Sequence, residues 1–221
     1  MTPVAKMKDF GQRMRFLGFS IFLNSAANAL TISTNLGSAV WTGSSVNLAS
    51  WIHVPLGTTM FIYGIVITIM NQLFLGRFDR RRFVSNILYI IPFSYLVEWI
   101  GYFWDWLGVS QLGLPARIVI DIIGLTGVAF AVSIYQRCNI IMHPNDDLSY
   151  IIRFRFLHGS SIIAQWASYL PPVTIIVLSY LATGQLHAIG FGTIWALVTQ
   201  GAVMGWADVH VFSRLKHHVD V

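Results

Sequence analysis

The stretch FLGFSIFLNSAANALTISTNL, residues 16–36, decides the fold class, because it is long, largely apolar and free of charged side chains. A helix needs about 20 such residues to cross the roughly 30 Å of hydrocarbon in a bilayer. Five further blocks of similar length follow, at residues 55–75, 83–107, 118–136, 161–182 and 189–209. With 55% hydrophobic and 10% charged residues, a soluble chain of 221 residues would have too little polar surface. The sequence therefore predicts an all-α polytopic membrane protein with six transmembrane helices.

Basic residues lie in alternate connections between these blocks. Of the 14 Lys and Arg residues, 13 precede the first block or follow the second, fourth and sixth blocks. They are Lys6, Lys8, Arg13, Arg15, Arg77, Arg80, Arg81, Arg82, Arg137, Arg153, Arg155, Arg214 and Lys216. Because positive charge favours the cytoplasmic side, both termini are expected to be cytoplasmic. The net charge of +5 is then explained by topology and by anionic lipid, and no basic patch indicates a nucleic-acid partner.

The chain divides near residues 108–117, where Gly108, Gly113 and Pro115 favour a turn. Each half has three blocks and three glycines at similar intervals: Gly18, Gly57 and Gly76 in the first, and Gly124, Gly159 and Gly184 in the second. Since three is odd, two such copies cross the membrane in opposite directions. The prediction is a pair of inverted-topology repeats of three helices, an architecture associated with alternating-access transporters.

The predicted segments follow from this division. They are a cytoplasmic N-terminus (1–15), a first three-helix repeat (16–107), an external linker (108–117), a second three-helix repeat (118–212) and a cytoplasmic tail (213–221). Pro92 is expected to interrupt the third helix, and Pro171 with Pro172 the fifth. Gly201 and Gly205 form a Gly-x-x-x-Gly face that permits close helix contact, within the bundle or between subunits.

Three short motifs resemble those of a bacterial family. Leu36-Gly37-Ser38-Ala39-Val40-Trp41 is similar to the Leu-Gly-x-x-Pro-Trp-Asp loop of the YczE branch of the YczE/YyaS/YitT family of bacterial integral membrane proteins. His143-Pro144-Asn145-Asp146 keeps the Pro and Asp that Val40 and Thr42 replace in the first copy, and Gly190-Phe191-Gly192-Thr193 is similar to a Gly-x-Gly-Thr element. The resemblance, over residues 13–213, implies a multi-pass protein of the bacterial cytoplasmic membrane with transport suspected.

A polar stripe marks the first helix. Ser20, Asn24, Asn28, Thr31 and Asn35 follow one another at steps of four, four, three and four, which places all five on one face. Amides facing lipid would be unpaired, so this face is expected to look into the bundle or a wet cavity. Two interpretations remain open: lining for a polar solute, or interhelical hydrogen bonding.

The acidic residues within the blocks also have both a functional and a structural interpretation. Glu98 is well inside the third block and marks an ion path or proton site, or else belongs with neighbouring Trp and Tyr residues to an outer interfacial belt. Asp121 is expected to pair with Arg117, and Asp208 to lie at the inner edge of the sixth block. Gln165 and Gln200 are deeper, and add hydrogen bonds to a cavity or between helices.

Seven residues make up the predicted substrate-binding set: Asn24, Asn28, Thr31, Asn35, Glu98, Gln165 and Gln200. No catalytic residue, cofactor or metal site is predicted. The loop from His143 to Asp147 offers ligand side chains without a recognised metal spacing, and no nucleotide-binding loop or nucleophile elbow is present.

The predicted function is secondary transport, or facilitated passage, of a small polar solute or ion between the two repeats, without an ATPase. The main alternative is a membrane-embedded scaffold whose partner is another membrane protein or a second copy of the chain. A lipid-directed enzyme is a third alternative, with Asp208 or the loop at His143 to Asp147 as its only sources of a catalytic group.

Overall fold

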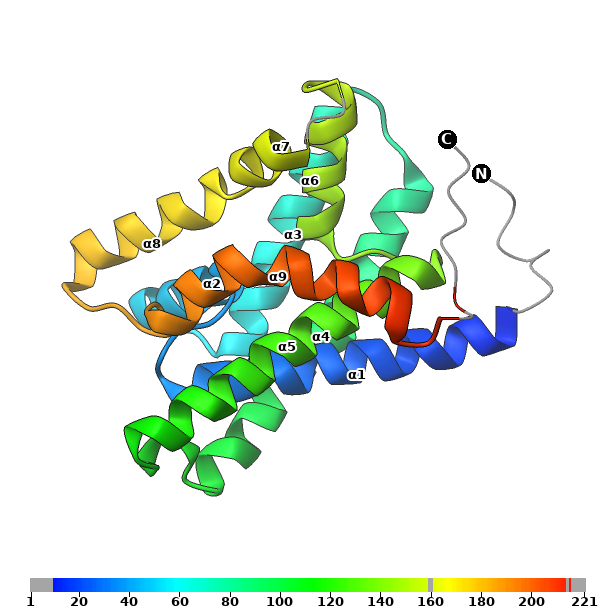
Figure 1. Cartoon of the computed structure of the whole chain (residues 1–221). Helices are drawn as coiled ribbons and strands as arrows, with labels where there is room; N and C mark the ends of the chain where they lie inside the picture. Colours follow the sequence, from blue (N-terminus) through cyan, green and yellow to red (C-terminus); the bar gives the residue numbers. More distant parts are fainter. Residues whose placement is uncertain (1–9, 159–160, 214, 216–221) are drawn as a thin grey trace.

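The computed structural model describes residues 10–158, 161–213 and 215, and its regular structure there is helical. The elements in chain order are α1 (Phe10–Thr34), α2 (Val40–Ile52), α3 (Leu56–Leu75), α4 (Arg80–Trp106), the 3-10 turn η2 (Val109–Gln111), α5 (Leu114–Cys138), α6 (Pro144–Arg155), α7 (Ser161–Ser168), α8 (Leu170–Thr183) and α9 (Phe191–His210). Figure 1 shows α1, α4 and α5 side by side with α9 next to α5, and α8 extending away to one side.

Five segments are long and apolar enough to cross a bilayer: α1, α3, α4, α5, and Ile163–Thr183, which covers most of α7 and all of α8. They indicate a membrane protein, as predicted. The sixth predicted span forms α9, which has 20 residues but is not among the five, because Gln200, Asp208 and His210 lower its mean hydropathy.

Two short helices were not predicted. α2 lies in the connection treated as an external loop, and α6 lies in the cytoplasmic loop. Gly, Ser, Thr and Asn interrupt the apolar pattern of α2, while two Asp and two Arg residues give α6 a polar composition. With 13 and 12 residues they are too short to span a bilayer. Each predicted repeat of three helices therefore contains an additional short helix.

Helix packing brings the two halves of the chain together. α1 lies along α5 and α4, and α5 also contacts α9. α3 packs on α4 and α6, whereas α2 packs on α8. Gly124 permits the close approach of α5 to α1, because a Cβ at Gly124 would lie 3.2 Å from the Ala27 carbonyl oxygen.

The prolines have different effects. α4 continues through Pro92 without a break. The fifth predicted helix is divided at Tyr169, and Pro171 and Pro172 lie in the first turn of α8, where the missing N–H groups cost least. Gly201 and Gly205 are exposed, with no neighbouring atom where a Cβ would be.

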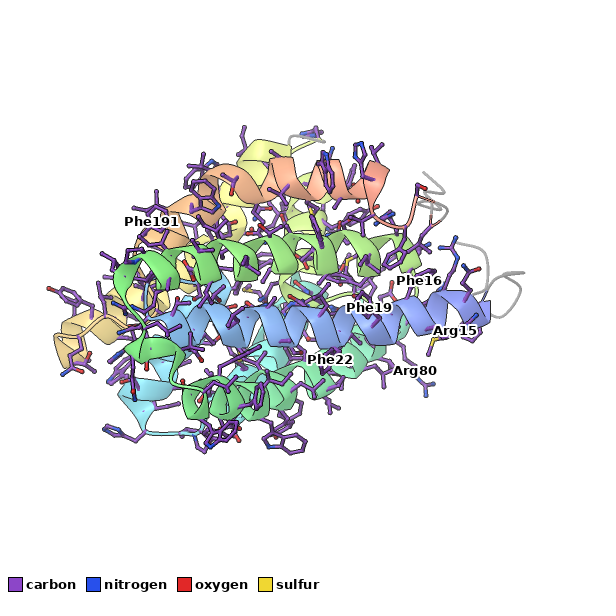
Figure 2. All side chains as sticks on the ribbon, turned by 60° about the horizontal axis from the view of Figure 1, so that its bottom comes forward. Arg15, Phe16, Phe19, Phe22, Arg80 and Phe191 are labelled. Atoms are coloured by element: carbon purple, nitrogen blue, oxygen red, sulfur yellow. The ribbon has the colours of Figure 1, made fainter. Side chains whose placement is uncertain are left out.

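Arginines gather at one end of the molecule, where several satisfy helix C-termini. Figure 2 shows Arg15 and Arg80 at this end and Phe191 at the opposite end. Arg13 Nη1 donates to the Arg137 carbonyl at the end of α5 (2.7 Å), and Arg155 donates to the Leu75 carbonyl at the end of α3. These bonds pair carbonyls that a helix end leaves free, so the basic residues contribute to packing as well as to charge asymmetry.

Candidate functional site

A cavity of about 90 Å³ lies where the N-termini of α2 and α6 approach the polar face of α1. Side chains from α3, α4, α5 and α9 complete its wall. This volume accommodates several water molecules or one small solute. The cavity therefore has room for a small ligand within the bundle.

Asn24 and Asn28 of α1 form one wall of the cavity and are linked to each other. Asn28 Nδ2 donates to Asn24 Oδ1 (2.8 Å), and Asn24 Nδ2 donates to the Tyr89 hydroxyl oxygen of α4 (2.9 Å). Both amides are buried, so these bonds fix their orientation.

The start of α2 forms a second wall. Thr42 Oγ1 donates to Asn28 Oδ1 (2.6 Å), which ties α2 to α1. Trp41 also lines the cavity, and its ring lies 5.7 Å from that of Tyr63 on α3. Ala39, Trp41 and Thr42 line the cavity, so the positive end of the α2 dipole lies beside it, and no side chain caps this N-terminus.

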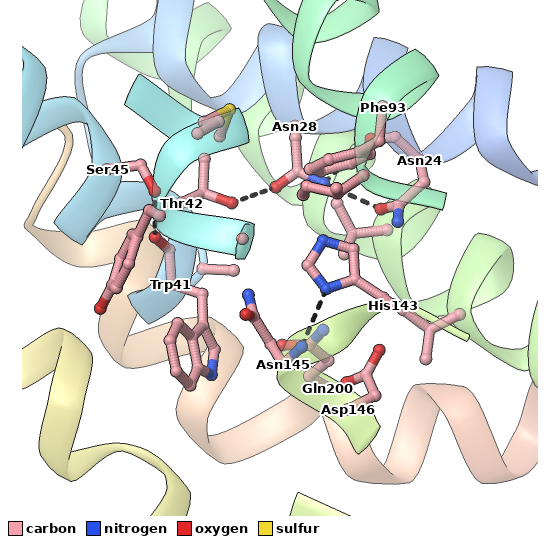
Figure 3. A pocket seen from close by; sticks show the side chains of 17 residues that line it. Asn24, Asn28, Trp41, Thr42, Ser45, Phe93, His143, Asn145, Asp146 and Gln200 are labelled. Carbon is pink, nitrogen blue, oxygen red and sulfur yellow. Dashed lines mark hydrogen bonds between the residues drawn. The ribbon is translucent and has the colours of Figure 1, made fainter. Parts of the chain in front are cut away.

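The start of α6 forms the opposite wall and includes His143, Asn145 and Asp146 (Figure 3). The Asn145 N–H donates to His143 Nδ1 (3.2 Å), so the ring proton is assigned to Nε2. Burial lowers the pKa of His143 to about 3, so its imidazole is neutral at physiological pH. Burial, with a smaller contribution from neighbouring Asp147, raises the pKa of the Asp146 carboxyl to about 7.

The adjacent carboxylate, Asp147, is already neutralised. Arg82 Nη1 donates to Asp147 Oδ1 at 2.7 Å, and Asn86 donates to Asp147 Oδ2 (3.3 Å). Burial raises the pKa of Asp147 to about 6, and the Arg82 charge opposes this effect. Asp146 is thus the charged side chain left to the cavity lining, which contains no Lys or Arg.

Thr42 and Asp146 occupy equivalent helical positions, each the third residue of its short helix. The two helices come from different halves of the chain, and both residues line the cavity. The motif comparison between Val40-Trp41-Thr42 and Pro144-Asn145-Asp146 was the sequence signal for this pair. Sequence alone predicts loops for both segments, and a loop prediction does not bring Thr42 and Asp146 to one site.

The cavity brings together three residues of the predicted substrate-binding set, Asn24, Asn28 and Gln200. Thr31 is buried behind them, and its hydroxyl donates to the Asn28 carbonyl (2.8 Å). Asn35 is exposed just beyond the end of α1, in a left-handed conformation with φ 52°. The polar stripe is therefore buried over most of its length, and two of its amides line the cavity.

Glu98 and Gln165 lie away from the cavity. The Tyr102 hydroxyl donates to Glu98 Oε1 (3.2 Å) among exposed aromatic side chains, and Glu98 packs against Gly57 near the start of α3. Gln165 is exposed on α7, where its side-chain oxygen accepts a hydrogen bond from Ser149 (3.3 Å).

Asp121 and Asp208 have structural partners. The sequence predicts a pair of Asp121 with Arg117, but Thr34 lies between them. Its hydroxyl donates to Asp121 Oδ1 (2.9 Å), and its carbonyl accepts from Arg117 (3.1 Å). Asp208 Oδ1 lies 3.4 Å from Arg137 Nε. Across the described residues, no group of three His, Cys, Asp or Glu side chains is placed to hold a metal ion.

A family model described as a family of unknown function, DUF6198, matches residues 11–209. The chain belongs to the DUF6198 family. No curated protein and no solved structure matches it. The segment matched to DUF6198 includes both short helices and every residue that lines the cavity.

Proposed function

We propose that this protein is a membrane transporter or facilitator that passes a small polar solute or ion through the cavity between α1, α2 and α6. The cavity is the observation that carries the proposal. It is lined by amide, hydroxyl, imidazole and carboxyl groups within a bundle of long apolar helices. Interhelical association needs few polar contacts, whereas a solute site needs polar groups that converge on a space.

The packing pattern supports two inverted repeats, α1–α4 and α5–α9. If α1, α2, α3 and α4 correspond to α5, α6, α7 with α8, and α9, several of the observed contacts occur in matching pairs, whereas the extensive contact of α3 with α4 has no counterpart of similar extent between α8 and α9. The contact of α1 with α4 matches that of α5 with α9, and the contact of α2 with α8 matches that of α6 with α3. In such a pair of repeats, the contact of α1 with α5 would lie on the pseudo-twofold axis. Sites between such repeats, near broken or short helices, are common in secondary transporters.

The proposed orientation places both termini in the cytoplasm, since Arg15 and Arg80 lie at the end of the molecule that also holds the start of α1. Passage is driven by a solute or ion gradient. The suspected transport role of YczE-like proteins is consistent with this proposal.

Flux into proteoliposomes tests the proposal directly. Purified protein is reconstituted and exposed to a panel of radiolabelled or osmotically active small solutes and ions. We expect flux of one solute class above that of protein-free vesicles, and we expect Asn28→Leu and Gln200→Leu to reduce it by about tenfold or more because each removes a polar group from the pathway.

Gln165→Leu is the matched control, because it removes the same amide from an exposed position outside the cavity. It should leave flux unchanged. Equal loss in Gln165→Leu and Gln200→Leu, or an absence of flux for every solute, would contradict a pathway through the cavity.

The exposed face at Gly201 and Gly205 favours a second candidate function, a scaffold for another membrane protein. Nothing within 4 Å occupies the space beside either glycine. A substitution pair separates the two functions. Gly201→Leu with Gly205→Leu should abolish recovery of a membrane partner if the protein is a scaffold, and should leave solute flux intact if it is a transporter.

A further inference from the structure

We infer that the cavity binds a small monovalent cation, such as ammonium or methylammonium, against the carboxylate of Asp146. This inference rests on the proposed function and names the class of its ligand. Asp146 comes from α6, which is not one of the membrane-spanning helices, and Figure 3 places it beside Asn145 and Gln200.

Among the described residues, no hydrogen bond or ion pair reaches the oxygens of Asp146, which lines the cavity wall. Asp146 is half-buried, so its carboxylate is incompletely solvated. A bound cation or a proton would stabilise it.

The groups around Asp146 supply no positive side chain. On α6, Asp147 is held by Arg82 of α4, and His143 is neutral. Tyr89 of α4 and Tyr169, between α7 and α8, are the other titratable groups that interact electrostatically with Asp146. The side chains that α2 and α9 contribute to the cavity carry no charge. A cation therefore finds a carboxylate that no positively charged side chain of the cavity lining neutralises.

The structure also limits the charge and size of the ligand. The starts of α2 and α6 each bring the positive end of a helix dipole to the cavity, which offsets part of the single carboxylate and disfavours a divalent ion. About 90 Å³ holds a small cation with a little water. The neutral oxygens of Asn145 and Gln200 and the ring of Trp41 offer further contacts that a monovalent ammonium group accepts.

A proton competes with the cation for the same oxygens. Since the pKa of Asp146 is about 7, the carboxylate is largely free above this pH and protonated below it. Cation affinity should therefore be greatest at alkaline pH and fall by about tenfold for each pH unit below 7.

Calorimetric titration tests the inference. The purified full chain is titrated with ammonium chloride and with methylammonium chloride, at pH 8 and at pH 5.5. We expect binding at pH 8 that weakens at pH 5.5. Asp146→Asn should weaken binding at pH 8 by about 30-fold or more, the lower end of what losing one partner of a buried charge pair costs. Asp146→Glu keeps the charge and should retain measurable, pH-dependent binding.

Asp105→Asn is the matched control, because it removes an acidic charge from an exposed position outside the cavity. It should bind both cations as the wild-type chain does. Cation binding that survives Asp146→Asn, or binding of sodium formate or nitrate that becomes tighter in Asp146→Asn, would overturn the inference.

The flux panel separates this inference from the proposed function. If neutral solutes cross and Asn28→Leu stops them while no cation binds, the cation assignment fails and the transport proposal stands. If no solute crosses at all, the proposed function itself fails.

Discussion

At the scale of single residues, the protonation of Asp146 in the cavity affects the stability of the folded protein. Its pKa in the folded chain, about 7, lies above the ordinary value of 3.8, so between these values the folded state binds more protons than the unfolded state. The contribution of Asp146 to stability therefore falls as pH rises from about 4 to 7, because the folded state must accommodate an incompletely solvated carboxylate. His143, whose pKa is lowered to about 3, contributes with the opposite sign between about pH 3 and 6.5, so the effect of Asp146 is measured as a difference between variants.

Substitution with asparagine should remove this pH dependence. We expect Asp146→Asn to melt at a higher temperature than the wild-type chain at pH 8 and at a similar temperature at pH 4.5, measured by thermal unfolding in detergent without ammonium. Asp105→Asn serves again as the control. If the melting temperatures of the wild-type chain and of Asp146→Asn changed with pH to the same extent, the Asp146 carboxylate would be well solvated or paired, which would contradict this account.

At the scale of helices, Arg137 secures the end of α9. Its guanidinium is almost fully buried, pairs with Asp208, and donates to the carbonyls of Phe212 (3.2 Å) and Leu215 (3.1 Å). Arg137→Met should destabilise the protein by about 3 kcal/mol, because breaking a buried charged network leaves its partners unpaired.

Comparison of melting temperatures in detergent checks this prediction, with Arg81→Met as the control. Arg81 is exposed and carries the same charge at the same end of the molecule. Equal melting temperatures for the two variants would mean that the Arg137 contacts contribute little to stability.

The long helices could be predicted from sequence, and the short ones could not. Long, mainly apolar stretches define α1, α3, α4 and α5, because in lipid the outer surface must be apolar as well as most of the core. α2 and α6 contact other helices on several sides, so they tolerate Ser, Asn and Asp and lose the apolar signal. Asn24 and Asn28 could be found from their spacing, whereas Asp146 and Thr42 required the tertiary contact of two helix starts.

At the scale of the whole molecule, the central claim is that the cavity between the two halves is a solute pathway. Its lining combines α1 and α2 from the first half with α5, α6 and α9 from the second. Relative movement of the halves would change access to Asn28, Asp146 and Gln200 from either side.

Chemical modification at Gln200 tests this claim most directly. In a Cys138→Ser background, Gln200→Cys is treated with a membrane-impermeant methanethiosulfonate reagent in proteoliposomes, and Gln165→Cys is the control outside the cavity. We predict that Gln200→Cys is modified, that the transported solute slows the modification, and that flux is lost, while modified Gln165→Cys keeps its flux. Full flux through modified Gln200→Cys, or a Gln200→Cys thiol that the reagent reaches from neither side, would contradict the account.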